Sequence, residues 1–291
     1  MNKLLRYLLP KSLSPTFQVV SDLHLEIGQQ YSTYNIISQA PYLILGGDIG
    51  RLIDYEPYLE FLKVHKARFE KIFLVLGNHE FYGLSYAAGL EQAQKLQDEP
   101  ILDCKLVILH QACFDVPNSA VTILGCTLWS KIPEESMQVV QSRVKDFQKI
   151  CDWTVEDHNK AFESDYTWLK RAVSSMNETN PVSSQRSRTR TALVVTHHAP
   201  SMCGTSHPNH EQNPWSSAFA TDLISDREAW RNVGVWIFGH THYTTDFVRS
   251  GVRLFSNQRG YVLPGSIETT RSSKSRQTKP RVFDVRKTLR V

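Results

Sequence analysis

Five apolar runs of this 291-residue chain end in the same way, with polar side chains of the kinds that bind metal ions. Each run has the length and composition of a buried β-strand. Because the carboxyl ends of parallel strands meet at one edge of a sheet, we expect these polar residues to lie close together. The runs are FQVVSDLHLE from Phe17, APYLILGGD over 40–48, KIFLVLGNHE over 71–80, TALVVTHHAP over 191–200 and VGVWIFGHTH over 233–242.

A helix is predicted between the second and third of these strands. The segment Pro57–Phe69 places Leu59 and Leu62 at helical spacing, with Lys63 and Lys66 beside them. A helix that connects two strands implies parallel pairing, because a tight hairpin can join only antiparallel strands. The chain is therefore expected to have a layered α/β fold.

Other elements follow from the same patterns. Residues 121–130 are typical of a buried strand, and two or three helices are predicted within 134–173. We expect this helical segment, about 130–175, to flank the site as a cap. Alternation on both sides of Ser250-Gly251 indicates a hairpin, and residues 281–289 are expected to close a sheet edge.

Length and composition predict one large domain. Hydrophobic residues at 41% and charged residues at 21% are ordinary for a globular protein. We expect residues 1–16 to be an N-terminal arm, for which organelle targeting is not favoured, and residues 17–291 to be one domain. The five cysteines lack a CxxC pair, and no apolar run is long enough to cross a bilayer. These features indicate a cytoplasmic protein without membrane contact and leave its oligomeric state open.

Two polar stretches, 183–190 and 271–281, are rich in Arg or Lys, although the formal net charge is only +4. Basic loops can bind nucleic acid, but these contain no interleaved aromatic residues on which bases could stack. Solvated loops are therefore the favoured interpretation, with nucleic acid kept as an alternative partner.

The polar residues at the strand ends themselves predict a metal site. Along an extended backbone the side chains of Asp22-x-His24 point the same way, so one strand end offers an oxygen and a nitrogen ligand. His240-x-His242 repeats this arrangement with two imidazoles. A carboxylate such as Asp48 can bridge two cations, and Asn78 offers a neutral oxygen. Imidazole with oxygen ligands suits manganese, iron or zinc.

In order along the chain, these residues resemble the five sequence blocks of the calcineurin-like metallophosphoesterase superfamily. The resemblance covers residues 22–242. It implies a layered α/β/β/α sandwich of two mixed sheets flanked by helices, and hydrolysis of phosphate esters by a metal-bridging hydroxide. The matching blocks are Asp22-x-His24, Gly47-Asp48, Gly77-Asn78-His79-Glu80, His197 and Gly239-His240-Thr241-His242.

The resemblance also implies a role for each residue. Two divalent or mixed-valence transition-metal ions are expected. The first would take Asp22, His24, Asp48 and His242, and the second would take Asp48, Asn78, His197 and His240. His79 matches the histidine that donates a proton to the leaving oxygen or stabilises the charge on that oxygen.

The remaining site candidates rest on position in the sequence. Glu80 follows His79 directly and could orient it. His198 lies in the long loop that follows His197, so it is a candidate for substrate binding. Loops vary freely, and a single histidine is usually structural or solvated. We therefore expect solvated loop positions for His207 and His210, and structural positions for His65, His110 and His158.

Several branches of the superfamily share such a centre. Protein serine/threonine phosphatases carry an Asp-Arg-Gly triplet soon after the bridging aspartate, whereas this chain reads Ile49-Gly50-Arg51. The double-strand-break nucleases add further domains for DNA. Non-catalytic scaffolds of this fold lose metal ligands that are present here. The small phosphodiesterase-like branch fits best, which predicts a phosphodiester of a small molecule or nucleotide as substrate; a nuclease or a scaffold is the alternative.

Overall fold

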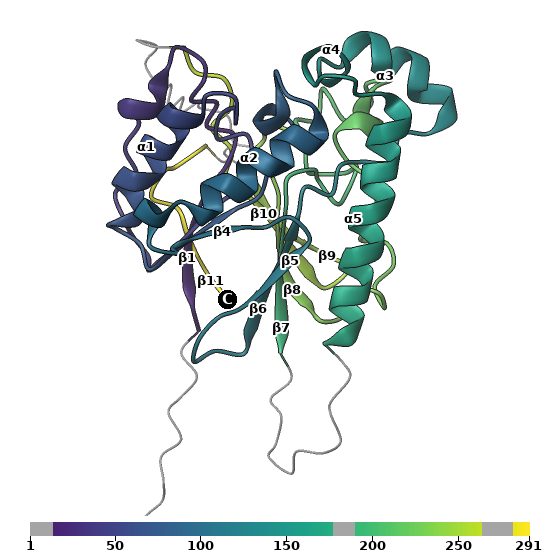
Figure 1. The fold of residues 1–291 in the computed structure, drawn as a ribbon. Helices are drawn as coiled ribbons and strands as arrows, with labels where there is room; N and C mark the ends of the chain where they lie inside the picture. The colour runs from purple at the N-terminus through teal and green to yellow at the C-terminus, as the bar shows by residue number, and fades with distance from the viewer. Residues whose placement is uncertain (1–13, 177–189, 264–281) are drawn as a thin grey trace, which may run out of the picture.

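Two β-sheets pack against each other between layers of helices (Figure 1). The computed structural model describes residues 14–176, 190–263 and 282–291. In the first sheet, of order β11-β1-β2-β3-β4, four strands run parallel and β11 pairs antiparallel with β1 at the edge. These strands are β1 (Thr16–Val20), β2 (Tyr42–Leu45), β3 (Lys71–Leu74), β4 (Leu106–Ile108) and β11 (Thr288–Arg290).

The second sheet has the order β5-β6-β7-β8-β10-β9. Its four inner strands run parallel, and β5 and β9 are antiparallel edges. The strands are β5 (Ala112–Asp115), β6 (Val121–Cys126), β7 (Thr191–Thr196), β8 (Val233–Ile237), β9 (Thr245–Arg249) and β10 (Val252–Ser256). The expected sandwich of two mixed sheets flanked by helices is therefore confirmed.

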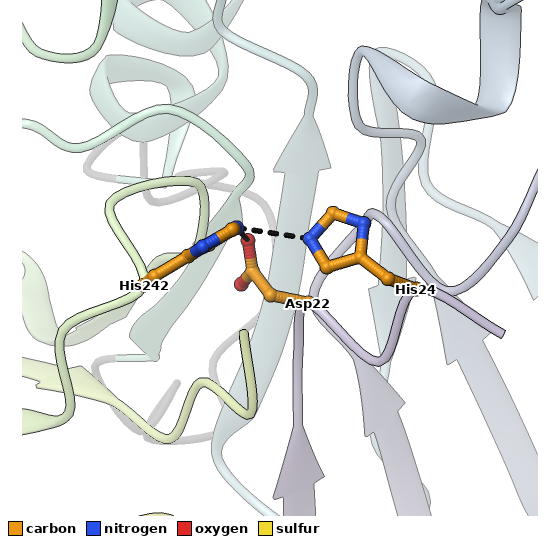
Figure 2. A group of neighbouring side chains, drawn as sticks. All are labelled: Asp22, His24 and His242. Carbon is orange, nitrogen blue, oxygen red and sulfur yellow. Dashed lines mark hydrogen bonds and ion pairs between the residues drawn. The ribbon is translucent and has the colours of Figure 1, made fainter. Parts of the chain in front are cut away.

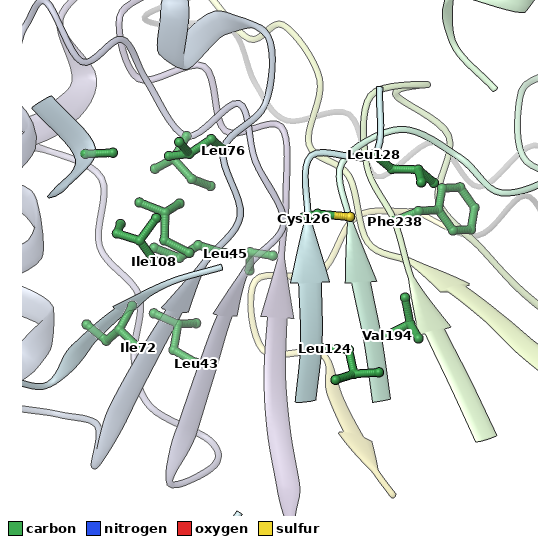
Figure 3. Packing of buried hydrophobic residues seen from close by; sticks show 14 of the residues in the cluster. Leu43, Leu45, Ile72, Leu76, Ile108, Leu124, Cys126, Leu128, Val194 and Phe238 are labelled. Atoms are coloured by element: carbon green, nitrogen blue, oxygen red, sulfur yellow. The ribbon is translucent and has the colours of Figure 1, made fainter. Parts of the chain in front are cut away.

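Strand alternation divides the core into two kinds of layer. Phe17, Ile44 and Phe73 point from the first sheet into the space between the sheets, where they meet Leu193 and Ile237 from the second. Alternate residues point outward to the helices, as Figure 3 shows for Leu43, Leu45 and Ile72 on one sheet and Leu124 and Val194 on the other. A strand that is buried on both faces must be apolar throughout, as the five predicted strands are.

Helices cover the outer face of each sheet. α1 (Tyr55–Lys66) and α2 (Tyr86–Asp98) lie beside the first sheet, and α5 (Val155–Ser175) lies beside the second (Figure 1). The cap also contains α3 (Met137–Arg143) and α4 (Asp146–Lys149). The 3-10 helices are η1 (Gln30–Ser32), η2 (His79–Phe81), η3 (Pro100–Leu102), η4 (Glu134–Ser136) and η5 (Ser216–Ala218).

Most of the predicted elements are present. The five apolar runs form β1, β2, β3, β7 and β8, the run from residue 121 forms β6, and the cap is helical. The predicted hairpin joins β9 to β10 through Ser250 and Gly251, both with positive φ, as the favoured two-residue turn requires. The helix expected over 57–69 begins two residues earlier, at Tyr55. The closing strand is shorter than expected, and only its end pairs with β1 as β11.

Some expectations concern parts of the chain outside the described residues. These are residues 1–13 of the N-terminal arm, all but Arg190 of the first basic stretch, and the second basic stretch. Within the described ranges, no helix combines the length and the apolar character that crossing a membrane requires.

The packing of α5 on the second sheet can be tested with Leu169→Ala. Leu169 is fully buried, so its truncation should lower the free energy of unfolding by about 2–5 kcal/mol. Arg171→Ala changes an exposed position two residues away in the same helix and should shift stability by less than about 0.5 kcal/mol. Urea denaturation measures both variants, and equal midpoints would contradict this packing.

Candidate metal centre

The metal-type side chains predicted from the sequence come together where strands of both sheets end. They form overlapping clusters, in each of which the ligand atoms lie within 4.8 Å of one another. Figure 2 shows one cluster, in which Nε2 of His24 and Nε2 of His242 point toward each other beside the carboxylate of Asp22. Asn78 joins through its Oδ1 atom, 3.1 Å from Nε2 of His197. The clusters are Asp22–His24–His242, His24–Asp48–His79 and Asp48–His197–His240.

The backbone at these positions is left-handed. Five of the site residues have φ between 49° and 70°, a region that non-glycine residues seldom occupy. The assumption that Asp22 and His24 converge because the strand continues through them is therefore wrong: β1 ends at Val20, and tight turns aim both side chains. Such strain tends to gather at functional sites. The five residues are Asp22, His24, Asp48, His240 and His242.

Hydrogen bonds to the backbone fix the two aspartates. Oδ1 of Asp22 accepts from the backbone N–H of His240, across the two sheets, at 2.9 Å. Oδ1 of Asp48 accepts from the backbone N–H of His79, also at 2.9 Å. Glycine is needed at Gly77 because a Cβ atom there would collide with this Asp48 oxygen. The close packing explains the Gly that precedes Asn78 in the sequence.

A carboxylate from the cap orients Asn78. Nδ2 of Asn78 donates to Oδ1 of Asp146 at 2.8 Å, which turns the amide oxygen toward His197. The hydroxyl of Tyr82 donates to the same Asp146 oxygen at 2.7 Å. Burial raises the pKa of Asp146. Asp146 was not predicted from the sequence, since it lies 68 residues from Asn78 and belongs to no recognisable block.

Glu26 is the carboxylate that contacts His79. Its Oε1 atom lies 2.8 Å from Nδ1 of His79 and 3.4 Å from Nδ1 of His24. The opposite nitrogen of His79, Nε2, lies 3.2 Å from the Tyr261 hydroxyl, and the ring stacks on Tyr82 at 4.2 Å. Glu26 stands two residues after His24 in SDLHLE, so a signal for it was present in the sequence.

The expectation that Glu80 orients His79 is wrong. Its side chain turns to the backbone beneath the site and accepts from the N–H groups of Asp48, Ile49 and Gly77 at 2.7–2.8 Å. The Tyr58 hydroxyl also donates to it, at 3.1 Å. Glu80 thus holds together the loops that carry Asp48 and Asn78.

The surroundings of the site favour the ionised form of the Asp48 carboxylate and the neutral form of two imidazoles, those of His240 and His242. Burial opposes ionisation of Asp48, but neighbouring histidines outweigh it and hold the Asp48 pKa well below its usual value. Burial lowers the pKa of both His240 and His242, so these rings keep a free lone pair for a metal. For His79 burial works against protonation, yet the carboxylates of Asp48 and Glu26 raise its pKa to about 9.

The other histidines occupy different environments. His198 is fully buried, and its ring packs against His240 at 4.1 Å and Trp129 at 5.4 Å. His207 and His210 are exposed loop residues, as expected, but both line the cleft over the metal-type residues. His65 and His158 are buried and bonded to nearby groups, which is the structural role predicted for them.

A cleft of about 600 Å³ lies over the clusters. Its floor includes Asp48, Asn78 and His79, and one wall comes from the cap, through Arg143 and Lys145. A volume of this size is typical of sites for small molecules.

Fold and site together define a metallophosphoesterase. The chain belongs to the calcineurin-like phosphoesterase family, whose model matches residues 15–244. It is 25% identical over 268 residues to an uncharacterized protein of Acanthamoeba polyphaga mimivirus, a match that covers 83% of this chain and 90% of that protein. The solved structure of phosphopantetheinyl hydrolase from Mycobacterium tuberculosis shares the fold, with 17% identity, a TM-score of 0.61, and coverage of 86% and 91% of the two chains.

The role of Glu80 can be tested by Glu80→Gln at pH 8, above the value of about 7 to which burial and Asp48 raise its pKa. The amide nitrogen cannot accept a hydrogen bond, so buried N–H groups lose their partner, at a cost of about 1–3 kcal/mol in unfolding free energy. Glu91→Gln, at an exposed position of α2, is the matched control. Denaturant curves that coincide for the two variants would exclude this role.

Proposed function

We propose that this protein is a two-metal phosphoesterase that hydrolyses phosphodiesters of small molecules. The observation that carries the proposal is the overlap of the clusters at Asp48, which places one carboxylate beside two groups of imidazoles. In the proposed arrangement Asp48 serves both ions. Asp22, His24 and His242 complete the first ligand set, and Asn78, His197 and His240 complete the second.

The donor atoms fit divalent transition metals. Nε2 of His24 and Nε2 of His242 lie 2.9 Å apart, and two imidazole nitrogens that face each other offer lone pairs to one cation. Nε2 of His240 is buried without a hydrogen-bond partner among the described residues, as expected for an atom reserved for a metal. Oxygen and imidazole ligands without thiolate suit manganese, iron or zinc.

When bound, such a pair of ions would activate a water molecule and stabilise the charge that develops on the phosphate oxygens. The side chains of this protein provide the rest of the reaction. As water adds to phosphorus, the bond from phosphorus to the leaving oxygen breaks, and that oxygen needs a proton. His79 is the proposed donor, through Nε2, because its Nδ1 is occupied by Glu26.

Glu26 is the proposed positioning residue for this step. A carboxylate that accepts from Nδ1 fixes the ring orientation and leaves the proton to be transferred on Nε2. The same Glu26 oxygen contacts Nδ1 of His24 and would direct Nε2 of that ring toward a metal. Glu26 would thereby set the relative positions of a ligand and the proton donor.

The preference for phosphodiesters rests on the sequence after Asp48, which lacks the triplet of the protein phosphatases. The size of the cleft also supports a small substrate. Every ligand-type residue and His79 are present, which disfavours the non-catalytic scaffold.

Metal content tests the ligand assignment. The purified protein should contain up to two ions of manganese, iron or zinc, and chelation should abolish hydrolysis of bis(p-nitrophenyl) phosphate. Because Asp48 would serve both ions, Asp48→Ala should lose more metal than Asn78→Ala. Elemental analysis of both variants decides this, and equal metal retention would rule out the shared carboxylate.

The proton-donor role of His79 predicts a dependence on the leaving group. His79→Ala should retain its metal and lose roughly 10²–10⁴-fold in rate on an ester with a poor leaving group. The loss should shrink on a p-nitrophenyl ester, since that leaving oxygen is stable as an anion. Rates on a leaving-group series, with metal content measured on the same samples, test this. A uniform loss accompanied by missing metal would mean that His79 is only structural.

A further inference from the structure

Two cations of the cap line the cleft beside the proposed metal ligands. Arg143 is the last residue of α3, and Lys145 directly precedes α4. Both side chains are exposed and belong to the wall of the 600 Å³ cleft. Neither forms an ion pair with a carboxylate in the part of the chain that the structure describes. Two positive charges therefore face the cleft, and no carboxylate of the described residues pairs with either of them.

Their place on this wall is fixed by the residues between and beside them. Val144 is buried in a small apolar cluster that joins the cap to Ala218 and Phe219 of the opposite loop. Asp146, the neighbour of Lys145, is bonded to Asn78 in the metal centre. The backbone that carries the two cations is thus held by Val144 between them and by Asp146 after them. Lys145 directly precedes Asp146, whose carboxylate contacts the proposed metal ligand Asn78.

An aromatic surface adjoins Arg143. Its guanidinium lies over the Trp215 ring, 5.8 Å from the ring centre. A guanidinium over an aromatic face keeps its N–H groups free to bind an anion. Beside Trp215 lies a second cavity of about 110 Å³, which shares Phe219 and Thr241 with the cleft. The region next to Arg143 can therefore accept a flat or apolar group.

We infer that the substrate is a small, nucleotide-like phosphodiester with a second phosphate group, which Arg143 and Lys145 bind while the diester lies over the metal-type clusters. This inference rests on the proposed phosphodiesterase function. Phosphate oxygens accept charge-assisted hydrogen bonds from both kinds of cation. The volume of the cleft, about 600 Å³, is in the range of sites for small molecules, which favours a small substrate over a nucleic-acid strand.

Two substrates that differ by a single phosphate provide the kinetic test. Thymidine 5′-(p-nitrophenyl phosphate) has one phosphodiester, and its 3′-phosphorylated form adds the second anion with the same leaving group. The full-length protein supplied with Mn²⁺ should show a kcat/KM at least tenfold higher for the 3′-phosphorylated substrate, the effect expected for hydrogen bonds between charged groups. Arg143→Ala and Lys145→Ala should each reduce this ratio several-fold.

Lys149→Ala is the matched control, because Lys149 is an exposed cation of α4 that does not line the cleft. It should leave the ratio of the two substrates unchanged. A ratio near one in the parent protein, or a ratio that falls equally in Lys149→Ala, would overturn the inference.

Binding measured without turnover separates this inference from the proposed function. By calorimetry, thymidine 3′,5′-bisphosphate should bind at least tenfold more tightly than thymidine 5′-monophosphate, and the difference should shrink in Arg143→Ala. If neither p-nitrophenyl ester is hydrolysed but this difference is found, the proposed function fails and the phosphate site stands. Equal binding of the two nucleotides refutes the phosphate site. Preferential binding and cleavage of a single-stranded oligonucleotide would instead show a nuclease and overturn the small-molecule assignment.

Discussion

The carboxylate of Asp48 connects parts of the chain that come from both sheets. One of its oxygens accepts from the backbone of His79, which follows β3 in the first sheet, and lies 3.4 Å from Nε2 of His197, which follows β7 in the second. Removing this carboxylate would take from the buried His79 and His197 their main counter-charge at the point where the sheets meet. The arrangement of the site therefore depends on an anion that lies between two layers of the sandwich.

The backbone must adopt unfavourable conformations to bring so many metal-type side chains together. Strands that end at one edge deliver neighbouring loops, but the side chains converge only because the chain turns sharply at Asp22, Asp48 and His240, where φ is positive. Such turns are unfavourable for side chains with a Cβ atom, and buried hydrogen bonds must compensate for them. Glu80 provides two of them at the Asp48 turn, where it accepts from the N–H groups of Asp48 and Ile49, and it also accepts from Gly77 in the loop after β3. The buried glutamate that follows His79 thus supports the loop geometry rather than His79, the proposed proton donor.

The sequence was sufficient for those features that depend on local pattern. Buried strands are continuous apolar runs, and polar residues that follow them must lie at the sheet edge, so Asp22, Asp48 and His197 could be placed before the structure was known. Helix α2 was missed because its buried positions, among them Gly89 and Ala93, are small and give a weak apolar period. Contacts between loops that are distant in the sequence leave no periodic pattern, so they could not be predicted in this way.

For that reason the residues that orient the site were found only in the structure. Glu26 and Asp146 each bind a side chain of a different segment, and their roles depend on how loops fold back over the strand ends. Only Glu26 had a sequence signal, through its place two residues after His24. An acidic residue close to a predicted ligand is therefore a better candidate for orienting a histidine than one that follows the histidine directly, because adjacent side chains along a turn point apart.

One short segment of the cap, residues 143–146, contacts both the proposed metal centre and the cleft. Asp146 fixes the amide of Asn78, and Arg143 and Lys145 form part of the cleft wall. Because Val144 anchors this segment to Ala218 and Phe219, the opposite loop constrains the same backbone. A change of sequence in the cap that moved the cations would also move Asp146, and with it a proposed metal ligand. In the proposed function, substrate preference and metal binding would thus be linked mechanically through residues 143–146, whereas Asp22, His24 and His242 lie on turns that follow β1 and β8.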